Sequence, residues 1–205
     1  VLFAKFAMGL FEDPYGETFK NRKRHSPESV KLAKTIADES TVLLKNENQL
    51  LPLDAKSLKS IAIIGPNADQ VQFGDYTWSR NNKDGVTPLQ GIKNRVNKNT
   101  AIHYAKGCSL TSLDTSGIAE AVEAAKNSEV AVIFGGSASA ALARDYKSST
   151  CGEGFDLNDL NLTGAQSQLI REVYQTGTPV ILVLVTGKPF VIEWEKNNLP
   201  AILVQ

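Results

Sequence analysis

Glu153 is the carboxylate whose neighbours most favour chemistry, because it stands between two glycines, Gly152 and Gly154. Glycine adopts backbone conformations that other residues reach only with strain, and it keeps bulk away from the neighbouring side chain. A carboxylate in this setting can reach a bound substrate and exchange a proton with it. The same tripeptide also suits an ordinary solvated loop, so the residues alone leave both interpretations open.

A second segment gathers aromatic and polar side chains around Asp75, Tyr76, Trp78 and Arg80. Aromatic rings pack against the C–H faces of sugars, while carboxylate and guanidinium groups bind sugar hydroxyls. The segment is therefore a candidate sugar-binding wall, and these four side chains are candidate substrate-binding residues. The alternative is that Tyr76 and Trp78 only anchor the loop to the core.

Other familiar chemistries lack their motifs in this chain. Residues 135–139 (GGSAS) have no third glycine at dinucleotide spacing, and no Walker lysine–serine pair is present. A Gly-x-Ser-x-Gly nucleophile elbow is also missing. His25 and His103 lie far apart and show no Cys/His ligand spacing. We therefore expect neither a metal ion nor a cofactor.

The candidate residues lie in loops of a predicted alternation of strands and helices. Apolar runs predict strands at 61–64, 101–105, 130–134, 180–185 and 201–204, and helical spacing predicts helices at 27–40, 118–126 and 166–175. Strands that are apolar throughout are covered on both faces, and strands separated by helices form parallel sheets. We predict an α/β fold in which helices flank a mostly parallel sheet, an α/β sandwich. Ligands of such sheets bind beyond the carboxyl ends of the strands, where the long loops 65–88 and 135–160 lie.

Composition and charge narrow the class of partner. Hydrophobic residues make up 42% and charged residues 21% of the 205 residues, as in an ordinary globular domain. Lys and Arg number 22, as do Asp and Glu, so no net charge favours nucleic acid or an anionic membrane. The longest apolar runs are far shorter than the roughly 20 residues that cross a bilayer. We expect neither nucleic acid nor a membrane as a partner.

The cysteines and the two ends of the chain leave questions open. Cys108 and Cys151 could form a disulfide in an oxidising compartment or remain two thiols. Residues 1–25 have no clear period, and the basic stretch 20–25 predicts an exposed connector. The chain opens in an apolar segment without a signal-peptide cleavage site and ends on the apolar run PAILVQ. We expect it to be a piece of a larger protein.

Six segments form a specific series when they are taken together, in order and at their spacings. They are 9–15 (GLFEDPY), 40–46 (STVLLKN), 50–53 (LLPL), 61–68 (IAIIGPNA), 153–156 (EGFD) and 186–189 (TGKP). In this series the chain resembles glycoside hydrolase family 3, the β-glucosidase and β-xylosidase type, over nearly its full length. It departs from the family pattern at Leu157 and Lys188, where the family often has arginine, and at Thr163, where it often has proline.

The resemblance implies an N-terminal (β/α)₈ barrel followed by an α/β sandwich domain, with the active site between them. Residues 1–25 would be the end of the barrel and the interdomain linker, and 26–205 the sandwich domain without its last strands. Glu153 would be the general acid/base, and the loop around Tyr76 and Trp78 would line the aglycone side of the sugar site. The nucleophile, an aspartate of the barrel, has no counterpart in these residues. Related enzymes are usually exported, which implies a periplasmic or secreted location.

The resemblance therefore implies part of a retaining, exo-acting β-glycosidase, in the first place a β-glucosidase, that removes terminal β-linked sugars from an oligosaccharide or glycoside. Retaining hydrolysis needs two carboxyl groups about 5–5.5 Å apart, so this chain should be inactive until the barrel domain supplies the nucleophile. One alternative is a non-catalytic carbohydrate-binding or interaction module of the same fold. Another, a nucleotide-binding domain, would need a phosphate loop that the strand ends lack.

Overall fold

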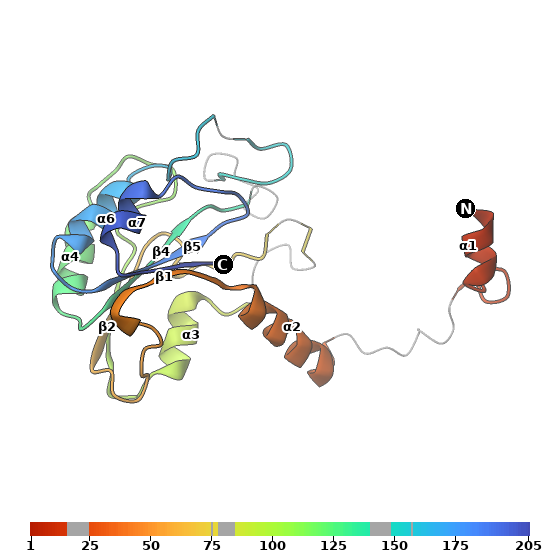
Figure 1. Ribbon diagram of the computed structural model, residues 1–205, viewed down its shortest axis with the longest axis horizontal. Coiled ribbons are helices and arrows are strands. Elements are labelled where there is room, and N and C mark those ends of the chain that lie inside the picture. The colour runs from red at the N-terminus through yellow and green to blue at the C-terminus, as the bar shows by residue number, and fades with distance from the viewer. Residues whose placement is uncertain (16–24, 75, 78–84, 140–148, 157) are drawn as a thin grey trace. The chain divides into compact units, whose positions relative to one another are not determined.

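A computed structural model gives the structure of the chain (Figure 1). It describes residues 1–15, 25–74, 76–77, 85–139, 149–156 and 158–205. The chain divides into two compact units, Val1–Ser40 and Thr41–Gln205. The two units are described separately below.

The described residues of the first unit, 1–15 and 25–40, form two helices, α1 (Leu2–Ala7) and α2 (Pro27–Ser40). No residue of either helix is buried. Helix α2 has the predicted bounds, and the Ser26 hydroxyl accepts a hydrogen bond from the Ser29 amide at 3.2 Å. A serine at this position satisfies an amide that the first turn of a helix leaves unpaired, which confirms the predicted helix start.

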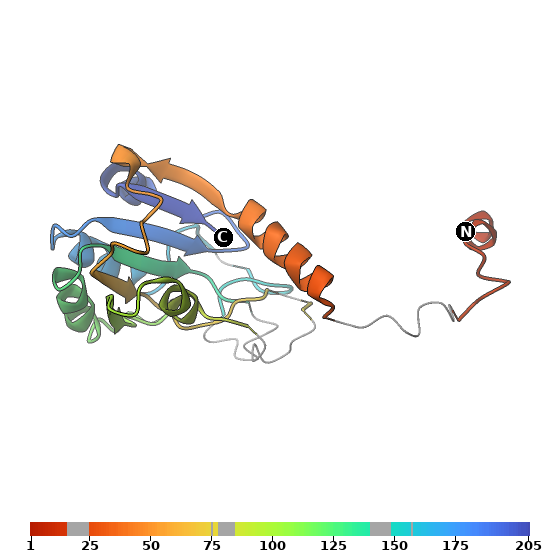
Figure 2. The same ribbon diagram turned by 90° about the horizontal axis from the view of Figure 1, so that it is seen from below.

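In the described part of the second unit, six strands form one sheet in the order β1-β6-β5-β4-β2-β3 (Figure 2). The strands are β1 (Val42–Asn46), β2 (Ser60–Ile64), β3 (Ala101–Ala105), β4 (Ala131–Gly136), β5 (Val180–Val185) and β6 (Ala201–Val204). Strand β1 runs antiparallel to β6, and the other neighbouring strands are parallel. The predicted α/β fold with a mostly parallel sheet is confirmed.

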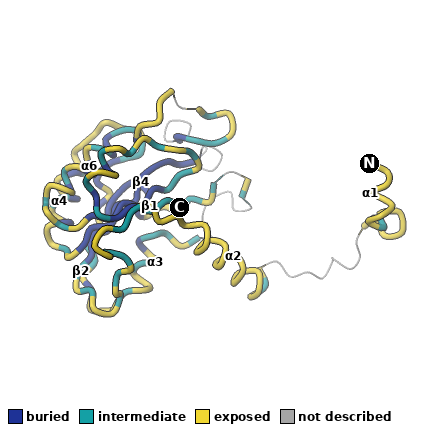
Figure 3. Tube along the Cα trace, in the orientation of Figure 1, coloured by how far each residue is buried: buried dark blue, intermediate teal, exposed yellow. Residues whose placement is uncertain are grey.

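Helices cover both faces of the sheet. One apolar cluster lies between the strands and α4 (Ile118–Lys126), α6 (Gln166–Tyr174) and α7 (Glu193–Asn198). The other lies between the strands and α3 (Pro88–Arg95). Neighbouring residues of β4 illustrate the arrangement, since Ile133 enters the first cluster and Phe134 the second. Burial on both faces explains why the central strands are apolar throughout, and Figure 3 shows them as the buried centre of this unit.

Four elements in the described part of the second unit were not predicted: α3, α7, the short 3₁₀ helix η2 (Glu47–Gln49) and the antiparallel edge strand β1. Helix α3 begins with a recognisable signal, because the Thr87 hydroxyl accepts a hydrogen bond from the Gln90 amide at 3.2 Å and Pro88 occupies the first turn. Helix α7 has only six residues, which are too few for a helical period to show.

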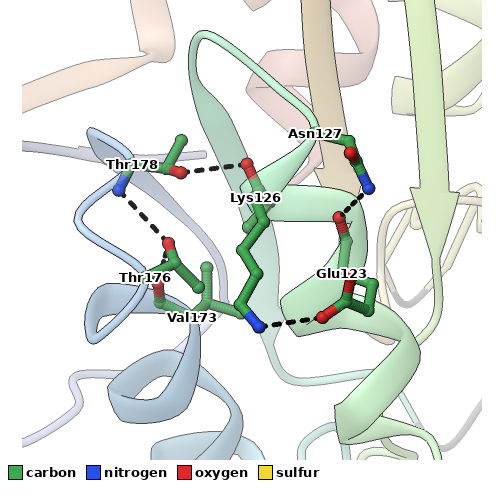
Figure 4. A network of polar contacts seen from close by, with 7 residues as sticks. Glu123, Lys126, Asn127, Val173, Thr176 and Thr178 are labelled. Carbon is green, nitrogen blue, oxygen red and sulfur yellow. Dashed lines mark hydrogen bonds and ion pairs between the residues drawn. The ribbon is translucent and has the colours of Figure 1, made fainter.

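A polar network closes the ends of α4 and α6, near the start of β5 (Figure 4). The Lys126 ammonium lies 2.8 Å from the Glu123 carboxylate, and the Asn127 side chain donates to the Glu123 carbonyl at 2.8 Å. Just before β5, the Thr178 hydroxyl donates to the carbonyl of Ala125 at 2.9 Å. The carbonyls of Glu123 and Ala125 already accept hydrogen bonds from the backbone amides of Asn127 and Ser128, so these side chains add a second bond to each. Thr178 also ties α4 to the neighbouring strand.

Both cysteines are free thiols, which decides between the two alternatives left open above. Cys108 is buried, and burial raises the pKa of its thiol to about 11, against the opposing effect of the Lys106 ammonium. Cys151 is partly exposed and lies just before the segment that contains Glu153. No helix in the described ranges combines the length and the apolar character that a membrane span needs.

Candidate active site

The backbones of neighbouring strands approach closely where the chain leaves β2 and β4. Gly65 and Gly136 have φ values of 112° and 131°, in a region that favours glycine. A Cβ atom on Gly65 would collide with the carbonyl of Phe134, and one on Gly136 would collide with the carbonyl of Val185. The loops after β2 and β4 therefore start from fixed positions beside each other, at the carboxyl end of the sheet.

Two buried amide side chains hold the chain at the end of β4. Gln166 accepts a hydrogen bond from the Gly136 amide at 2.8 Å and donates to the Gly136 carbonyl at 3.1 Å. The Asn67 side chain donates to the Ser137 carbonyl at 3.0 Å. Neither side chain is more than 1% exposed, so removing either would leave buried backbone groups unpaired, at a cost of about 1–3 kcal/mol for each group.

The loop that follows β4 returns to the point from which it leaves. Ser139 and Cys151 form a parallel bridge. The Thr150 amide donates to the Ala138 carbonyl at 2.9 Å, and the Thr150 hydroxyl accepts a hydrogen bond from the Ala138 amide at 3.1 Å. Glu153 follows this bridge by two residues, so its backbone position is set by the end of β4.

Glu153 and Tyr76 are brought together from the loops after β4 and β2. Glu153 is exposed, and the Tyr76 hydroxyl donates a hydrogen bond to its carboxylate. Tyr76 itself has a φ of 59°, an uncommon value for a residue with a side chain, so the turn around it is constrained. The structure thus places one predicted substrate-binding residue against the predicted acid/base residue. Asp75, Trp78 and Arg80 lie outside the described residues.

A pocket of about 330 Å³ opens between these loops. Gly152, the residue before Glu153, lies in the wall of this pocket, together with the loop after β2 and the ends of β4 and β5. Hydroxyl groups, amides and an aromatic ring line it, from Gln72, Phe73, Ser137, Ser139, Thr186 and Gln205. This lining can exchange hydrogen bonds with a polyhydroxylated ligand and pack against its apolar face. Within the described ranges, no group of three His, Cys, Asp or Glu side chains is placed to hold a metal ion.

The residues that fix this site were not identified from the sequence. Asn67 belongs to the segment 61–68, which carries the resemblance, but no role was predicted for it. Gln166 was read only as a residue of its helix, and Thr150 was not singled out. The one signal that could have identified these residues is their polar type. A polar side chain beside an apolar strand or inside a helix needs hydrogen-bond partners if it is buried.

The sheet order and the helices on both faces define an α/β sandwich domain, and the candidate site lies at the end of the sheet where such folds bind ligands. Residues 41–205 match the sequence profile of the Glycosyl hydrolase family 3 C-terminal domain. The chain belongs to glycoside hydrolase family 3, and the predicted resemblance is confirmed.

Similar proteins include β-xylosidases and β-glucosidases. A β-xylosidase from Formosa agariphila is 38% identical over 210 residues, and a periplasmic β-glucosidase from Salmonella typhimurium is 34% identical over 237 residues. Each match covers 99% of this chain but only 28% and 29% of the respective relative. The crystal structure of a β-glucosidase from Listeria innocua in complex with glucose superposes with a TM-score of 0.80 at 27% identity, covering 99% of this chain and 26% of that one. The chain thus spans less than a third of each of these proteins.

Proposed function

We propose that this chain is the part of a retaining, exo-acting β-glycosidase that supplies the general acid/base, Glu153. One observation carries the proposal: an exposed carboxylate, bonded to Tyr76, follows a firmly held loop base at the carboxyl end of the sheet. The relatives named above support a β-linked glycoside as the substrate, with terminal β-linked glucose as the proposed sugar. The Salmonella relative is named as periplasmic, which supports a periplasmic or secreted location.

The proposed reaction needs a second carboxylate about 5–5.5 Å from Glu153. That nucleophile attacks the anomeric carbon while Glu153 gives its proton to the departing glycosidic oxygen. Glu153 then takes a proton from water, and the resulting hydroxide breaks the glycosyl–enzyme ester with net retention. We assign the nucleophile to a barrel domain, whose end and linker would be residues 1–25, with 26–205 as the sandwich domain. By this proposal the chain alone does not hydrolyse glycosides.

The same chemistry assigns a role to the pocket. A general acid protonates the leaving group, so the leaving group lies on the side of the sugar that faces the acid. The 330 Å³ pocket shares its wall with the residue before Glu153, and Phe73 and Gly74 in that wall precede Tyr76 by two or three residues. We therefore assign this pocket, with the loop around Tyr76, Asp75, Trp78 and Arg80, to the leaving group of the substrate.

The test is Glu153→Gln in the intact enzyme, in which this chain works with its barrel domain. We expect kcat/KM for substrates with poor leaving groups, such as cellobiose, to fall roughly 10²–10⁴-fold. Dinitrophenyl glucosides, whose leaving group needs no proton, should form the glycosyl–enzyme at nearly the original rate. Azide should then restore turnover, because this anion attacks the intermediate without a general base. Glu172→Gln, at a partly exposed position of α6, is the matched control and should change neither substrate class.

An equal loss on both substrate classes would rule out the acid role. If Glu153→Gln changed neither class and the chain still bound saccharides, the domain would be a non-catalytic carbohydrate-binding module, the alternative that the sequence left open. The choice of sugar is tested separately, by comparing kcat/KM for nitrophenyl β-glucoside and β-xyloside in the unmodified enzyme.

A further inference from the structure

We propose that Lys188 is a positioning residue for the reaction: it fixes Glu153 by holding the carbonyl of Thr150. The proposal rests on the acid/base role of Glu153 proposed above. It adds a residue from a different strand end, 35 positions further along the chain than the carboxylate that it places.

Lys188 is itself held firmly just beyond β5. Its amide donates to the Thr186 hydroxyl oxygen at 3.0 Å, and that hydroxyl donates to the Lys188 carbonyl at 2.6 Å. The side chain is half-buried, and its ammonium lies 5.4 Å from the centre of the Phe190 ring, within the range of a cation–π interaction. From this position Nζ donates a hydrogen bond to the Thr150 carbonyl at 2.8 Å. A charged donor makes such a bond shorter and stronger than a neutral one.

Thr150 and Cys151 are the last firmly held residues before Glu153, and the Cys151 amide donates to the Ala138 carbonyl at 3.3 Å. Thr150 is fully buried, and its amide and hydroxyl both bond to Ala138 at the end of β4. With the Lys188 bond, every polar group of Thr150 has a partner. The chain then reaches Glu153 through Gly152, which has a φ of 120° and little intrinsic stiffness. The backbone of Glu153 therefore takes its place from the anchor at Thr150 and Cys151, and the Tyr76 hydroxyl then bonds to its carboxylate.

Charges around Lys188 fit this role. Burial lowers the pKa of Lys188, and the nearby Cys151, Asp159 and Asp156 act in the opposite direction. Two of these groups, Cys151 and Asp156, flank Glu153 in sequence. The segment that carries the acid/base residue is thus held to the end of β5 by a hydrogen bond, and the nearby carboxylate of Asp156 adds a favourable charge.

The test compares Lys188→Met and Lys188→Arg in the intact enzyme. Methionine keeps an unbranched side chain that is one atom shorter, but it carries no charge and donates no hydrogen bond. We expect Lys188→Met to lower kcat/KM for cellobiose roughly ten- to hundredfold, as a misplaced catalytic group does, and to leave dinitrophenyl glucosides within about threefold. Arginine keeps the charge and the donors, so Lys188→Arg should recover most of the lost activity. Lys126→Met, at an exposed lysine of α4, is the matched control and should have no effect.

A double-mutant cycle separates positioning from general damage. If Lys188 acts through Glu153, adding Lys188→Met to Glu153→Gln should lower activity by less than about twofold more. A full additional loss, or an equal loss on both substrate classes, would overturn the proposal. Should Lys188→Met not fold, Lys188→Gln, which has a neutral and shorter donor, gives the same comparison. The two proposals fail on different results. If the loss caused by Glu153→Gln does not depend on the leaving group, the proposed function is wrong. If Glu153→Gln shows this dependence and Lys188→Met does not, only the positioning role of Lys188 is wrong.

Discussion

The network at the ends of α4 and α6 and the network at the carboxyl end of the sheet use similar polar side chains over different distances in sequence. In the first, Glu123, Lys126 and Asn127 bond within four positions of one another, and the one long-range bond described joins Thr178 to Ala125, 53 positions away (Figure 4). In the second, the bonds that hold the end of β4 span longer distances, 30 positions from Gln166 to Gly136 and 70 from Asn67 to Ser137. Short-range bonds complete individual helices, whereas long-range bonds fix loops relative to one another. A site assembled from several loops needs the second kind.

Replacing a glycine at or beside each network with alanine should give the largest difference in the free energy of unfolding. Gly136→Ala places a Cβ against the Val185 carbonyl at a φ of 131°, so we expect the free energy of unfolding to fall by more than about 3 kcal/mol. Gly177→Ala, next to the network of Figure 4, meets no atom within 4 Å at a φ of 78° and should cost only about 1–2 kcal/mol. Urea denaturation of the two variants measures both values. Equal losses would show that the end of β4 is no more crowded than an ordinary turn.

A pH-dependent loss of stability should come next in size, and it originates in the buried thiol beyond β3. Burial raises the pKa of Cys108 from its ordinary value of 9.0 to about 11. The folded chain therefore keeps a proton that the unfolded chain releases, so this stabilisation is complete below pH 9 and is lost as the pH rises to 11. The loss amounts to roughly 2–3 kcal/mol.

Urea denaturation at pH 8, 9, 10 and 11 measures this dependence in the unmodified chain and in Cys108→Ala. Other groups also titrate in this range, so the relevant quantity is the difference between the two curves. Cys151→Ala removes the partly exposed thiol and should follow the unmodified chain. If Cys108→Ala also followed it, the buried thiol would not be the source.

The smallest effect should belong to the exposed ion pair of Figure 4. Lys126 and Glu123 lie 2.8 Å apart, but more than half of each side chain is exposed to water. Solvent screening and side-chain entropy leave such pairs little net energy, so Lys126→Met should change the free energy of unfolding by less than about 0.5 kcal/mol. Urea denaturation detects a larger change, which would show that the local network supports more than the helix end.

The sheet could be predicted because its strands carry their own signal. Runs such as 180–185 are apolar throughout, and the helices between them have clear periods, so strands, layers and parallel direction follow. The antiparallel direction of β1 carries no such signal. It depends on pairing with β6, which lies almost 160 positions later, and half of each apolar side chain of β1 is exposed.

Part of the candidate site could also be predicted, because its residues carry a local signal in the sequence. Glycines on both sides drew attention to Glu153, and the rule that ligands gather at strand ends placed the loop of Tyr76 in the same region. The supports could not be predicted, because nothing in the sequence links Lys188 to Thr150 or Asn67 to Ser137. Each of these bonds depends on the register of the strands, which only the folded sheet defines.

The bridge between Ser139 and Cys151 brings together two residues that are twelve positions apart in the sequence. Because Ser139 and Cys151 are paired, the sequence between them can change in length and composition during evolution while the flanking segments keep their positions. Lengthening a closed loop adds only about 0.6 kcal/mol of entropy for each doubling. An insertion between these two residues should therefore leave the backbone position of Glu153, the proposed acid/base residue, unchanged.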